Sequence, residues 1–326
     1  MYDVVAIGNL VVDFIQPSLS SIPSWESLID AEEPTTLHVG GNAGIFSIIA
    51  SRLGLKTAVV GAVGNDFLGS WLLEQIKKNN VNVKNIKKFG KTSTTVVLGH
   101  KNGERGFIHY EGANSELKKR DIDKKLLRKT RSLHLCGYFL MEKLYGKPSE
   151  DILKEAKKNG VLTTFDVAWD PKNRWTLDNI LEFVDIFFPN FLEVKKIAGC
   201  SSIKEACEKL IEKGVGMVVV KIGKYGCYIC SPEFHFHIPT FETNVLEGTG
   251  SGDAFDAAFV FGLLKKMEYK NLSKKELEKI ALLANATASY TTTMIGCENF
   301  SGLKDVHDFI KNSKLSHIVY DEKGIG

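Results

Sequence analysis

The residues most suited to chemistry lie in one short stretch late in the chain, 247–255, with the sequence EGTGSGDAF. Gly248, Gly250 and Gly252 alternate there and an apolar run follows at once, so we expect a tight loop that opens a buried helix. The start of a helix offers unpaired N–H groups and the positive end of its dipole, which together suit a phosphate. Asp253 is then best explained as a base that takes the proton from a hydroxyl group attacking that phosphate.

Two other interpretations of this stretch stay open at this point. One is an ordinary glycine-rich turn in which Asp253 caps the helix, the usual role of such an Asp. The other is a dinucleotide-binding turn. It fits less well, because that motif belongs in the first strand-helix unit and this stretch lies late in the chain.

Composition limits the classes of protein to which the chain can belong. It has 326 residues, 44% of them hydrophobic and 25% charged, which suits one large α/β domain with an appendage as well as two domains. The net charge is only +3 and acids are interspersed among the lysines, so no nucleic-acid partner is expected. The sequence shows no signal-peptide pattern and no apolar run of membrane-spanning length, which favours a cytoplasmic protein without membrane contact.

The six cysteines are scattered along the chain, which favours free thiols over a disulfide framework. Cys227 and Cys230 form a C-x-x-C ahead of His235 and His237, but no second ligand pair has a recognised metal-binding spacing. A strand and a hairpin therefore explain this segment better than a metal site.

Short strands rich in β-branched residues alternate with helices along most of the chain. This order predicts a mostly parallel sheet with helices on both faces, a three-layer α/β/α domain over residues 1–312 that is followed by a tail at 313–326. The expected strands are 4–7, 59–64, 132–135, 162–165, 186–188 and 217–220, and the expected helices are 45–53, 71–78, 149–159, 176–182, 192–198 and 203–213.

A β-hairpin stands apart from this alternation. The β-rich runs 94–98 and 106–110 flank Asn102-Gly103, a strong hairpin signal. We expect the hairpin to join the segment after Asp13 in a small sheet, so that about 10–40 and 92–112 form a lid.

Polar residues follow several of the predicted strands directly. Asp166 follows one strand, Asn190 and Glu193 follow the next, and Lys221 ends the last. Because ligands of such sheets bind at the carboxyl ends of parallel strands, we expect these side chains around one site. Asp13 is a lone acid in an apolar stretch, and a buried acid needs a partner or a function.

Together these motifs resemble the PfkB, or ribokinase-like, family of carbohydrate kinases over nearly the whole chain. The sequence GSGD at 250–253 looks like the family's C-terminal signature, and Gly40-Gly41 with the helix that follows looks like its N-terminal one. The run PNFLE at 189–193 is similar to the family's Asn-x-x-Glu motif, and Asp13 stands where the family keeps a substrate-binding acid. The agreement of several motifs in order favours Asp253 as a base over a plain helix cap.

The resemblance implies transfer of the γ-phosphate of ATP to a primary hydroxyl group of a sugar. Asp253 would be the base, and an anion hole would come from the backbone N–H groups of Gly250, Ser251 and Gly252. Asn190 and Glu193 would hold Mg²⁺, mainly through water. A helix cap with an acid in the first turn is the other interpretation of that pair.

The resemblance also implies residues for the two substrates. Those bordering ATP would be Lys221, Gly223, Gly226, Thr249 and Asn285, although a Lys that closes a strand is often only a surface residue. On the acceptor side, Asp13 suits vicinal hydroxyls, and the backbone around it would come from Gly40, Gly41 and Asn42. Arg105 and Arg174 are the cations best placed for an acidic or phosphorylated sugar; if both face water, they are ordinary surface arginines.

Two departures from the family pattern stand out. Glu247-Gly248 replaces the usual Asp-Thr, which leaves a monovalent-cation site in doubt, and Ile45 stands where the family usually has an Asn. Neither feature identifies the acceptor.

A nucleoside kinase of the same family is the alternative function, and it predicts an aromatic platform for a base from Phe14, Phe107 or Tyr110. A non-catalytic sugar- or nucleotide-binding protein is a further alternative, against which the intact Asp253 argues. The open edges of a lid sheet favour a homodimer through the lid.

Overall fold

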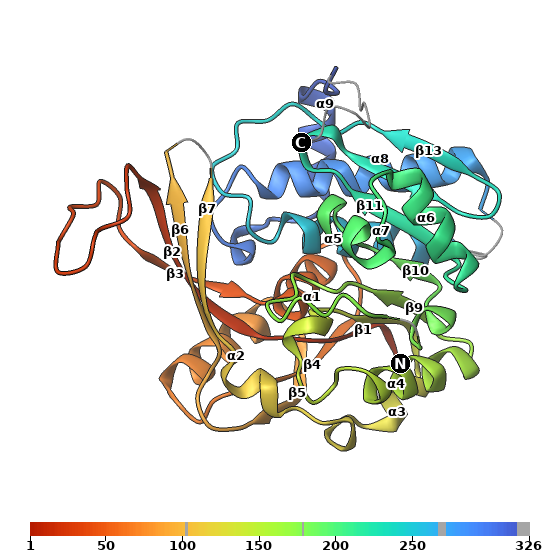
Figure 1. Cartoon of the computed structure of the whole chain (residues 1–326), viewed down its shortest axis with the longest axis horizontal. Helices are drawn as coiled ribbons and strands as arrows, with labels where there is room; N and C mark the ends of the chain where they lie inside the picture. Colours follow the sequence, from red (N-terminus) through yellow and green to blue (C-terminus); the bar gives the residue numbers. More distant parts are fainter. Residues whose placement is uncertain (102–103, 178, 267–271, 318–326) are drawn as a thin grey trace.

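The computed structural model describes residues 1–101, 104–177, 179–266 and 272–317 of the chain. These residues form two β-sheets with helices around the larger one (Figure 1). Strands of the larger sheet follow the order β13-β12-β11-β10-β9-β8-β1-β4-β5, and those of the smaller sheet the order β3-β2-β6-β7. The predicted turn at Asn102-Gly103 lies outside the described residues.

The larger sheet is parallel from β5 to β11, and only β12 and β13 pair antiparallel. Within β1, Val4 and Ala6 pack into one apolar layer and Val5 and Ile7 into the other, so the strand is buried on both faces. The bounds are β1 Tyr2–Ile7, β4 Thr57–Val63, β5 Asn82–Lys88, β8 Thr130–Leu135, β9 Leu162–Phe165, β10 Ile186–Phe187, β11 Met217–Lys221, β12 Cys227–Cys230 and β13 His235–Ile238.

Helices cover both faces of this sheet, which confirms the predicted three-layer α/β/α architecture. One layer contains α1 (Asn42–Arg52), α2 (Phe67–Lys78), α7 (Ser251–Leu264), α8 (Lys274–Thr291) and α9 (Leu303–Asn312). The other contains α3 (Lys124–Arg128), α4 (Lys147–Lys158), α5 (Phe191–Ala198) and α6 (Ile203–Glu212). Helix α7 is buried along nearly its whole length, as its apolar sequence requires, and packs against α1 and α8.

One predicted helix is wrong. Among the described residues of 176–182, the structure has only the start of a 3₁₀ turn, Leu181–Phe183. The preceding loop explains this, because Asp170 accepts hydrogen bonds from the backbone N–H groups of Lys172 (3.0 Å) and Trp175 (3.1 Å). Trp175 itself has a positive φ of 49° and a largely buried side chain, so the chain enters this segment in a compact loop and not at a helix start.

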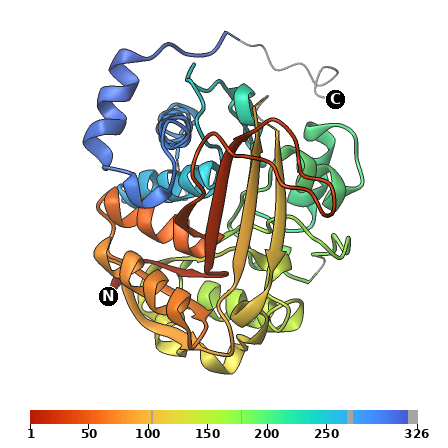
Figure 2. The same ribbon diagram turned by 90° about the vertical axis from the view of Figure 1, so that its left-hand side faces the viewer.

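The small sheet combines β2 (Val11–Leu19), β3 (Thr36–Gly40), β6 (Thr94–His100) and β7 (Arg105–Tyr110), as predicted from the hairpin and the segment at Asp13. It stands at one side of the main domain, with β2, β6 and β7 next to one another (Figure 2). Asp13 pairs with Thr95, and Thr95 pairs with His109, so these three side chains share a face. Every second residue of β7 also lies on that face, which places Arg105 and Phe107 there.

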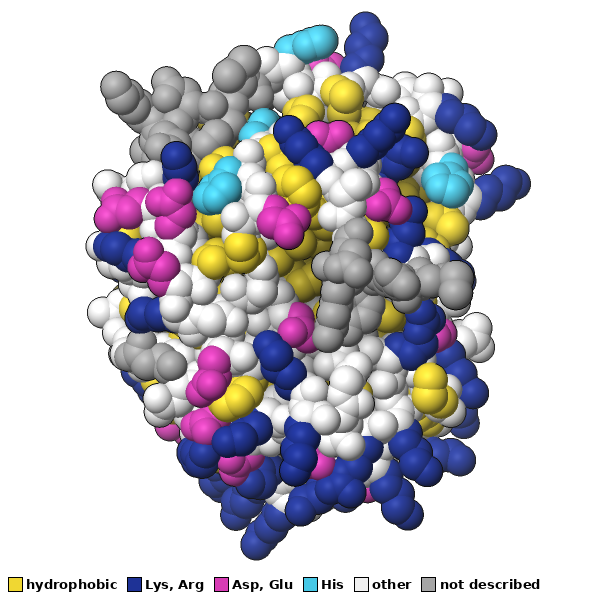
Figure 3. Space-filling view, turned by 90° about the vertical axis from the view of Figure 1, so that its right-hand side faces the viewer, with side chains coloured by type: hydrophobic (Ala, Val, Ile, Leu, Met, Phe, Trp, Pro, Cys, Tyr) yellow, Lys and Arg dark blue, Asp and Glu magenta, His cyan; other side chains and the backbone are white. Residues whose placement is uncertain are grey.

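The face opposite the small sheet carries many Lys and Arg side chains, which gather toward its lower end in Figure 3. On α3 and α4, which lie at that end, Arg128 pairs with Glu155 (2.6 Å) and Lys147 pairs with Asp151 (3.1 Å). Part of the positive charge is therefore balanced locally. None of the described helices is long and apolar enough to cross a membrane.

Candidate active site

Two cavities meet at the N-terminus of α7. The first, of ≈ 470 Å³, is lined partly by Asn285 and Ser289 of α8, and we call it the α8 cavity. The second, of ≈ 700 Å³, lies under the small sheet, and we call it the small-sheet cavity. Ser251 and Gly252 line the first cavity, whereas Gly250 and Asp253 line the second, so the first turn of α7 separates the two.

The loop before α7 has the geometry of an anion-binding helix start. Gly250 is the N-cap residue and has φ 81°, a left-handed conformation that glycine adopts without strain. The first N–H groups of any helix have no partner inside the helix, and the dipole adds partial positive charge there. Ser251 directs its N–H (3.3 Å) and its hydroxyl (2.8 Å) to the Gly248 carbonyl oxygen.

Asp253 is buried in the first turn of α7. Its Oδ1 atom accepts a hydrogen bond of 2.9 Å from Nδ2 of Asn42, the first residue of α1. Burial raises the pKa of Asp253 to about 8; the charge of Asp166 adds to this effect, and Lys221 and Asn42 oppose it. A carboxylate that titrates near neutral pH is suited to accept a proton during a reaction.

A buried ion-pair cluster lies close to this carboxylate. Lys221, at the end of β11, places its Nζ 2.6 Å from Asp166 and 3.1 Å from Asp256. Burial disfavours both charged forms, but the surrounding charges and hydrogen bonds together outweigh it. Attraction to Asp166 and Asp256 raises the pKa of Lys221, and attraction to Lys221 with its hydrogen bond lowers the pKa of Asp166. Lys221 is therefore no ordinary surface residue, and it lines the α8 cavity as well.

Asn190 and Glu193 begin α5 as a capping box. The Asn190 side chain accepts hydrogen bonds from the N–H groups of Leu192 and Glu193 (2.9 Å each), and Glu193 accepts one from the Asn190 N–H (2.8 Å). Both residues also line the small-sheet cavity, where burial and the charge of Asp166 raise the pKa of Glu193 to about 7. Amide and carboxylate oxygens are ligands that Mg²⁺ accepts, so this pair fits the ion as well as capping the helix.

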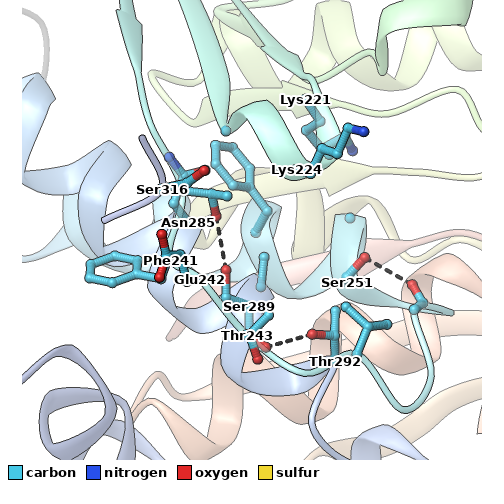
Figure 4. Close-up of a pocket in the computed structure, with 18 of the residues that line it drawn as sticks. Lys221, Lys224, Phe241, Glu242, Thr243, Ser251, Asn285, Ser289, Thr292 and Ser316 are labelled. Carbon is cyan, nitrogen blue, oxygen red and sulfur yellow. Dashed lines mark hydrogen bonds between the residues drawn. The ribbon is translucent and has the colours of Figure 1, made fainter. Parts of the chain in front are cut away.

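The other residues predicted to border ATP divide between the two cavities. Gly223, Gly226 and Asn285 line the α8 cavity with Lys221 and Lys224 (Figure 4). Asn285 donates hydrogen bonds to the carbonyl oxygens of Ile238 (3.1 Å) and Pro239 (3.0 Å). Thr249 lines the small-sheet cavity instead.

The first part of the predicted tail contributes to the same cavity. The N–H of Ser316 donates to the Thr240 carbonyl oxygen (2.8 Å), and the N–H of Glu242 donates to that of Lys314 (2.9 Å). Ser316 then lines the α8 cavity beside Thr240. The described residues after 312 are thus paired with the main domain.

The predicted acceptor residues gather in the small-sheet cavity. Asp13, Gly41 and Asn42 line it, and burial together with the charge of Glu247 raises the pKa of Asp13 to about 7. Gly40 lies behind Asp13, since a Cβ atom there would stand 2.2 Å from the Asp13 carboxylate. Gly40 therefore provides the space in which this acid is held.

The two predicted arginines have different surroundings. Arg105 lines both cavities, with its NH1 atom 3.5 Å from Glu247 and 3.4 Å from the Thr249 hydroxyl. Arg174 lines neither cavity. Its guanidinium pairs with Asp170 (3.1 Å) and Glu142 (3.2 Å) and lies 4.1 Å from the ring centroid of Tyr145.

Several lining residues were not predicted from the sequence. His109 could have been found from the alternation Arg105-x-Phe107-x-His109 in the expected hairpin, because such residues share a face. Asp256, which lines neither cavity but pairs with Lys221, had a signal too, as an acid in a largely apolar helix three residues after Asp253. The remaining lining residues that we did not single out include Asn9, Thr95, Leu140 and Trp169.

Comparison with known proteins agrees with this geometry. The model of the "pfkB family carbohydrate kinase" matches residues 1–303. An ATP-dependent 6-phosphofructokinase of Thermoanaerobacterium thermosaccharolyticum is 24% identical over 95% of each chain, and a nucleoside kinase of Methanothermobacter thermautotrophicus is 27% identical over 88% of each. The structure of ribokinase from Giardia lamblia superimposes with a TM-score of 0.81 at 20% identity, covering 95% of this chain and 98% of that one, which shows a shared fold. These findings confirm the prediction that the chain is an ATP-dependent sugar kinase. The chain belongs to the pfkB family of carbohydrate kinases.

Proposed function

We propose that this kinase binds ATP in the α8 cavity and its acceptor in the small-sheet cavity, and that Asp253 is the catalytic base between them. The observation that carries this assignment is the position of the first turn of α7. It has one side on each cavity, and Asp253 faces the cavity that holds the other predicted acceptor residues. A phosphoryl group transferred from ATP in the α8 cavity to an acceptor in the small-sheet cavity therefore passes the first turn of α7.

The transfer follows from the groups at this turn. A primary hydroxyl oxygen of the acceptor forms a bond to the γ-phosphorus, and its proton passes to Asp253. The bond from the γ-phosphorus to the β–γ bridging oxygen breaks, and its electron pair leaves with ADP. Backbone N–H groups of the anion hole stabilise the charge on the moving group, which is the main contribution expected from the protein. These groups belong to Gly250, Ser251 and Gly252, and the Ser251 N–H would leave the Gly248 carbonyl oxygen, which lies 3.3 Å away, to take this role.

Asn190 and Glu193 are the proposed holders of Mg²⁺, mainly through water. When bound, the ion neutralises phosphate charge. Glu247 accepts hydrogen bonds from the N–H (2.8 Å) and hydroxyl (2.6 Å) of Thr249 and lies 3.5 Å from Arg105. A carboxylate with these partners does not favour a monovalent-cation site in this loop, and we propose none.

For the acceptor, we propose a sugar whose hydroxyl groups bind Asp13. If that sugar carries an anionic group, Arg105 is the cation that binds it. Arg174 has its own acidic partners outside the cavity, so we leave it out of the acceptor site. A nucleoside is the second candidate. Phe107 and Trp169 favour it, because both line the cavity and expose more than half of their surface, as a platform for a base requires.

We also propose that the small sheet joins two copies of the chain in a homodimer. Strand β7 is an edge strand of that sheet, and Ile108 and Tyr110, on the face turned away from the cavity, are exposed. Unpaired edges with exposed apolar side chains favour pairing with another chain.

The test is ADP release from Mg-ATP with a panel of pentoses, hexoses, sugar acids, sugar phosphates and nucleosides. With the acceptor that reacts, we expect Asp253→Asn to lower kcat about 100-fold or more, because a general base is lost, while ATP affinity stays the same. Glu74→Gln, an exposed acid on α2, is the matched control and should leave turnover unchanged. Full turnover in Asp253→Asn would remove Asp253 from the mechanism.

A further inference from the structure

Among the residues that the structure describes, Arg105 is the only one that lines both cavities. It begins the edge strand β7 of the small sheet and reaches the loop before α7, which lies 142 residues further along the chain. That loop contains Glu247-Gly248, the pair at which the sequence departs from the family pattern. The contacts of Arg105 give this departure a physical explanation.

Glu247 is a fixed partner for the arginine. Its side chain is only 7% exposed. Both carboxylate oxygens accept hydrogen bonds from the Thr249 N–H (2.8 Å each), and one also accepts from the Thr249 hydroxyl (2.6 Å). The loop thus holds the carboxylate in place, with Oε1 3.5 Å from NH1 of Arg105, so its negative charge draws the guanidinium to the start of α7.

Gly248 supplies the space that the guanidinium fills. A Cβ atom at this position would lie 2.9 Å from NH1 of Arg105, closer than Cβ atoms approach other atoms in proteins, and 3.2 Å from its Cζ, which is a tight contact. The φ angle of Gly248 is outside the left-handed region, so its backbone does not require glycine. Any larger residue would therefore displace the end of the flexible Arg105 side chain and leave the fold intact.

We propose that Glu247 and Gly248 form a seat for Arg105 that positions its guanidinium between the two cavities, where it touches the phosphoryl group as this passes from nucleotide to acceptor. The inference rests on the proposed function, because it needs ATP and the acceptor on opposite sides of the α7 turn. Arg105 is then a catalytic residue, and Glu247 is the residue that positions it. The guanidinium adds a full positive charge opposite the partial charges of the helix start, where negative charge develops.

The test compares Arg105→Met, Gly248→Thr and the double variant. We expect each single variant to lower kcat by about 10- to 100-fold, the scale for loss of one group that stabilises transferred charge, with a much smaller change in KM for ATP. The double variant should be no slower than Arg105→Met, because both changes remove the same contact. Lys101→Met is the matched control, since this hairpin lysine pairs with Glu32 and should not affect kcat.

Binding of ADP with aluminium fluoride, a mimic of the moving phosphoryl group, provides a readout without any acceptor. We expect Arg105→Met and Gly248→Thr to weaken this binding at least about tenfold and to leave binding of Mg-ADP alone unchanged. Unchanged binding of the mimic in Arg105→Met would overturn the catalytic role of Arg105. If the losses of the two single variants add up in the double variant, the proposal that Glu247 and Gly248 form a seat for Arg105 is overturned. Weakened binding of the mimic in a protein that phosphorylates no acceptor would support the seat and count against the proposed transfer reaction.

Discussion

Burial of Asp253, with a further contribution from the charge of Asp166, sets the pH range in which this carboxyl group can act as a base. Because its pKa is raised to about 8, the carboxyl group is protonated at acidic pH and cannot accept a proton. We expect kcat/KM to rise with pH through an apparent pKa near this value, since kcat/KM reports the ionisations of the free enzyme. An acid limb near the ordinary carboxylate range, at pH 4, would contradict the buried environment of the base.

Lys221 allows a testable statement about stability. Lys221→Met leaves the Asp166 carboxylate buried without its cation, and loss of one partner from a buried pair costs about 3–5 kcal/mol in the free energy of unfolding. Urea denaturation should show this loss. It should be smaller at pH 5 than at pH 8, because unpaired buried carboxylates take up protons more readily as the pH falls.

Lys224 provides the matched control for that measurement. It lines the same cavity but is exposed, so Lys224→Met should change the unfolding free energy by less than about 0.5 kcal/mol. Equal effects of the two substitutions would mean that the ion-pair cluster contributes nothing specific to stability.

Asp253 and Asp13 could be predicted as site residues from their own sequence context, a glycine loop before an apolar run and a lone acid in a strand. Trp169 gave no such signal, because an aromatic residue near a strand end more often packs in the core. In the structure its ring is about half exposed and packs edge-on against that of Trp175, at 5.0 Å between the two ring centroids. This contact forms within one irregular loop, whose conformation has no periodic pattern in the sequence.

At the level of elements, the start of α5 has two roles that one substitution can separate. Glu193→Gln keeps an acceptor at the third helical position, so the capping box persists, but it removes the charge proposed for Mg²⁺. We expect unchanged thermal stability and at least about a tenfold rise in the Mg²⁺ concentration needed for half-maximal activity, the scale for lost metal contacts. Asn190→Ala removes the cap and should cost about 1 kcal/mol of stability. Normal Mg²⁺ dependence in Glu193→Gln would exclude Glu193 from the ion site.

The order and type of most elements could be predicted because strands such as β4 are short, rich in β-branched residues and bounded by helices. The segment 176–182 was different. Its backbone geometry is decided by Asp170, which draws the N–H groups of a loop around itself, and this side-chain effect leaves no periodic signal. Asp170 also pairs with Arg174, which explains why that arginine stays outside the cavities.

At the scale of the whole molecule, the sequence indicated which segments form the site but not how they meet. Arg105 lies on β7 of the small sheet and Glu247 lies in the loop before α7, and the sequence around neither residue predicts their contact. Only the placement of the small sheet over the carboxyl ends of the central strands brings them together (Figure 1). The division of the site into two cavities by α7 likewise follows from the packing of that helix in the core.

The small sheet also determines the last prediction, which concerns assembly. Ile108 is 64% exposed on edge strand β7, and Tyr110 on the same strand is 54% exposed. Trp25 and Leu28, in the connection between β2 and β3, are exposed as well. If two copies pair through this sheet, Ile108→Lys places a charge in the interface and should shift the protein from dimer to monomer in analytical ultracentrifugation. Phe67→Lys, at an apolar residue on α2 that is 76% exposed, is the control and should leave the dimer intact. A wild-type protein that stays monomeric at micromolar concentration would contradict the homodimer.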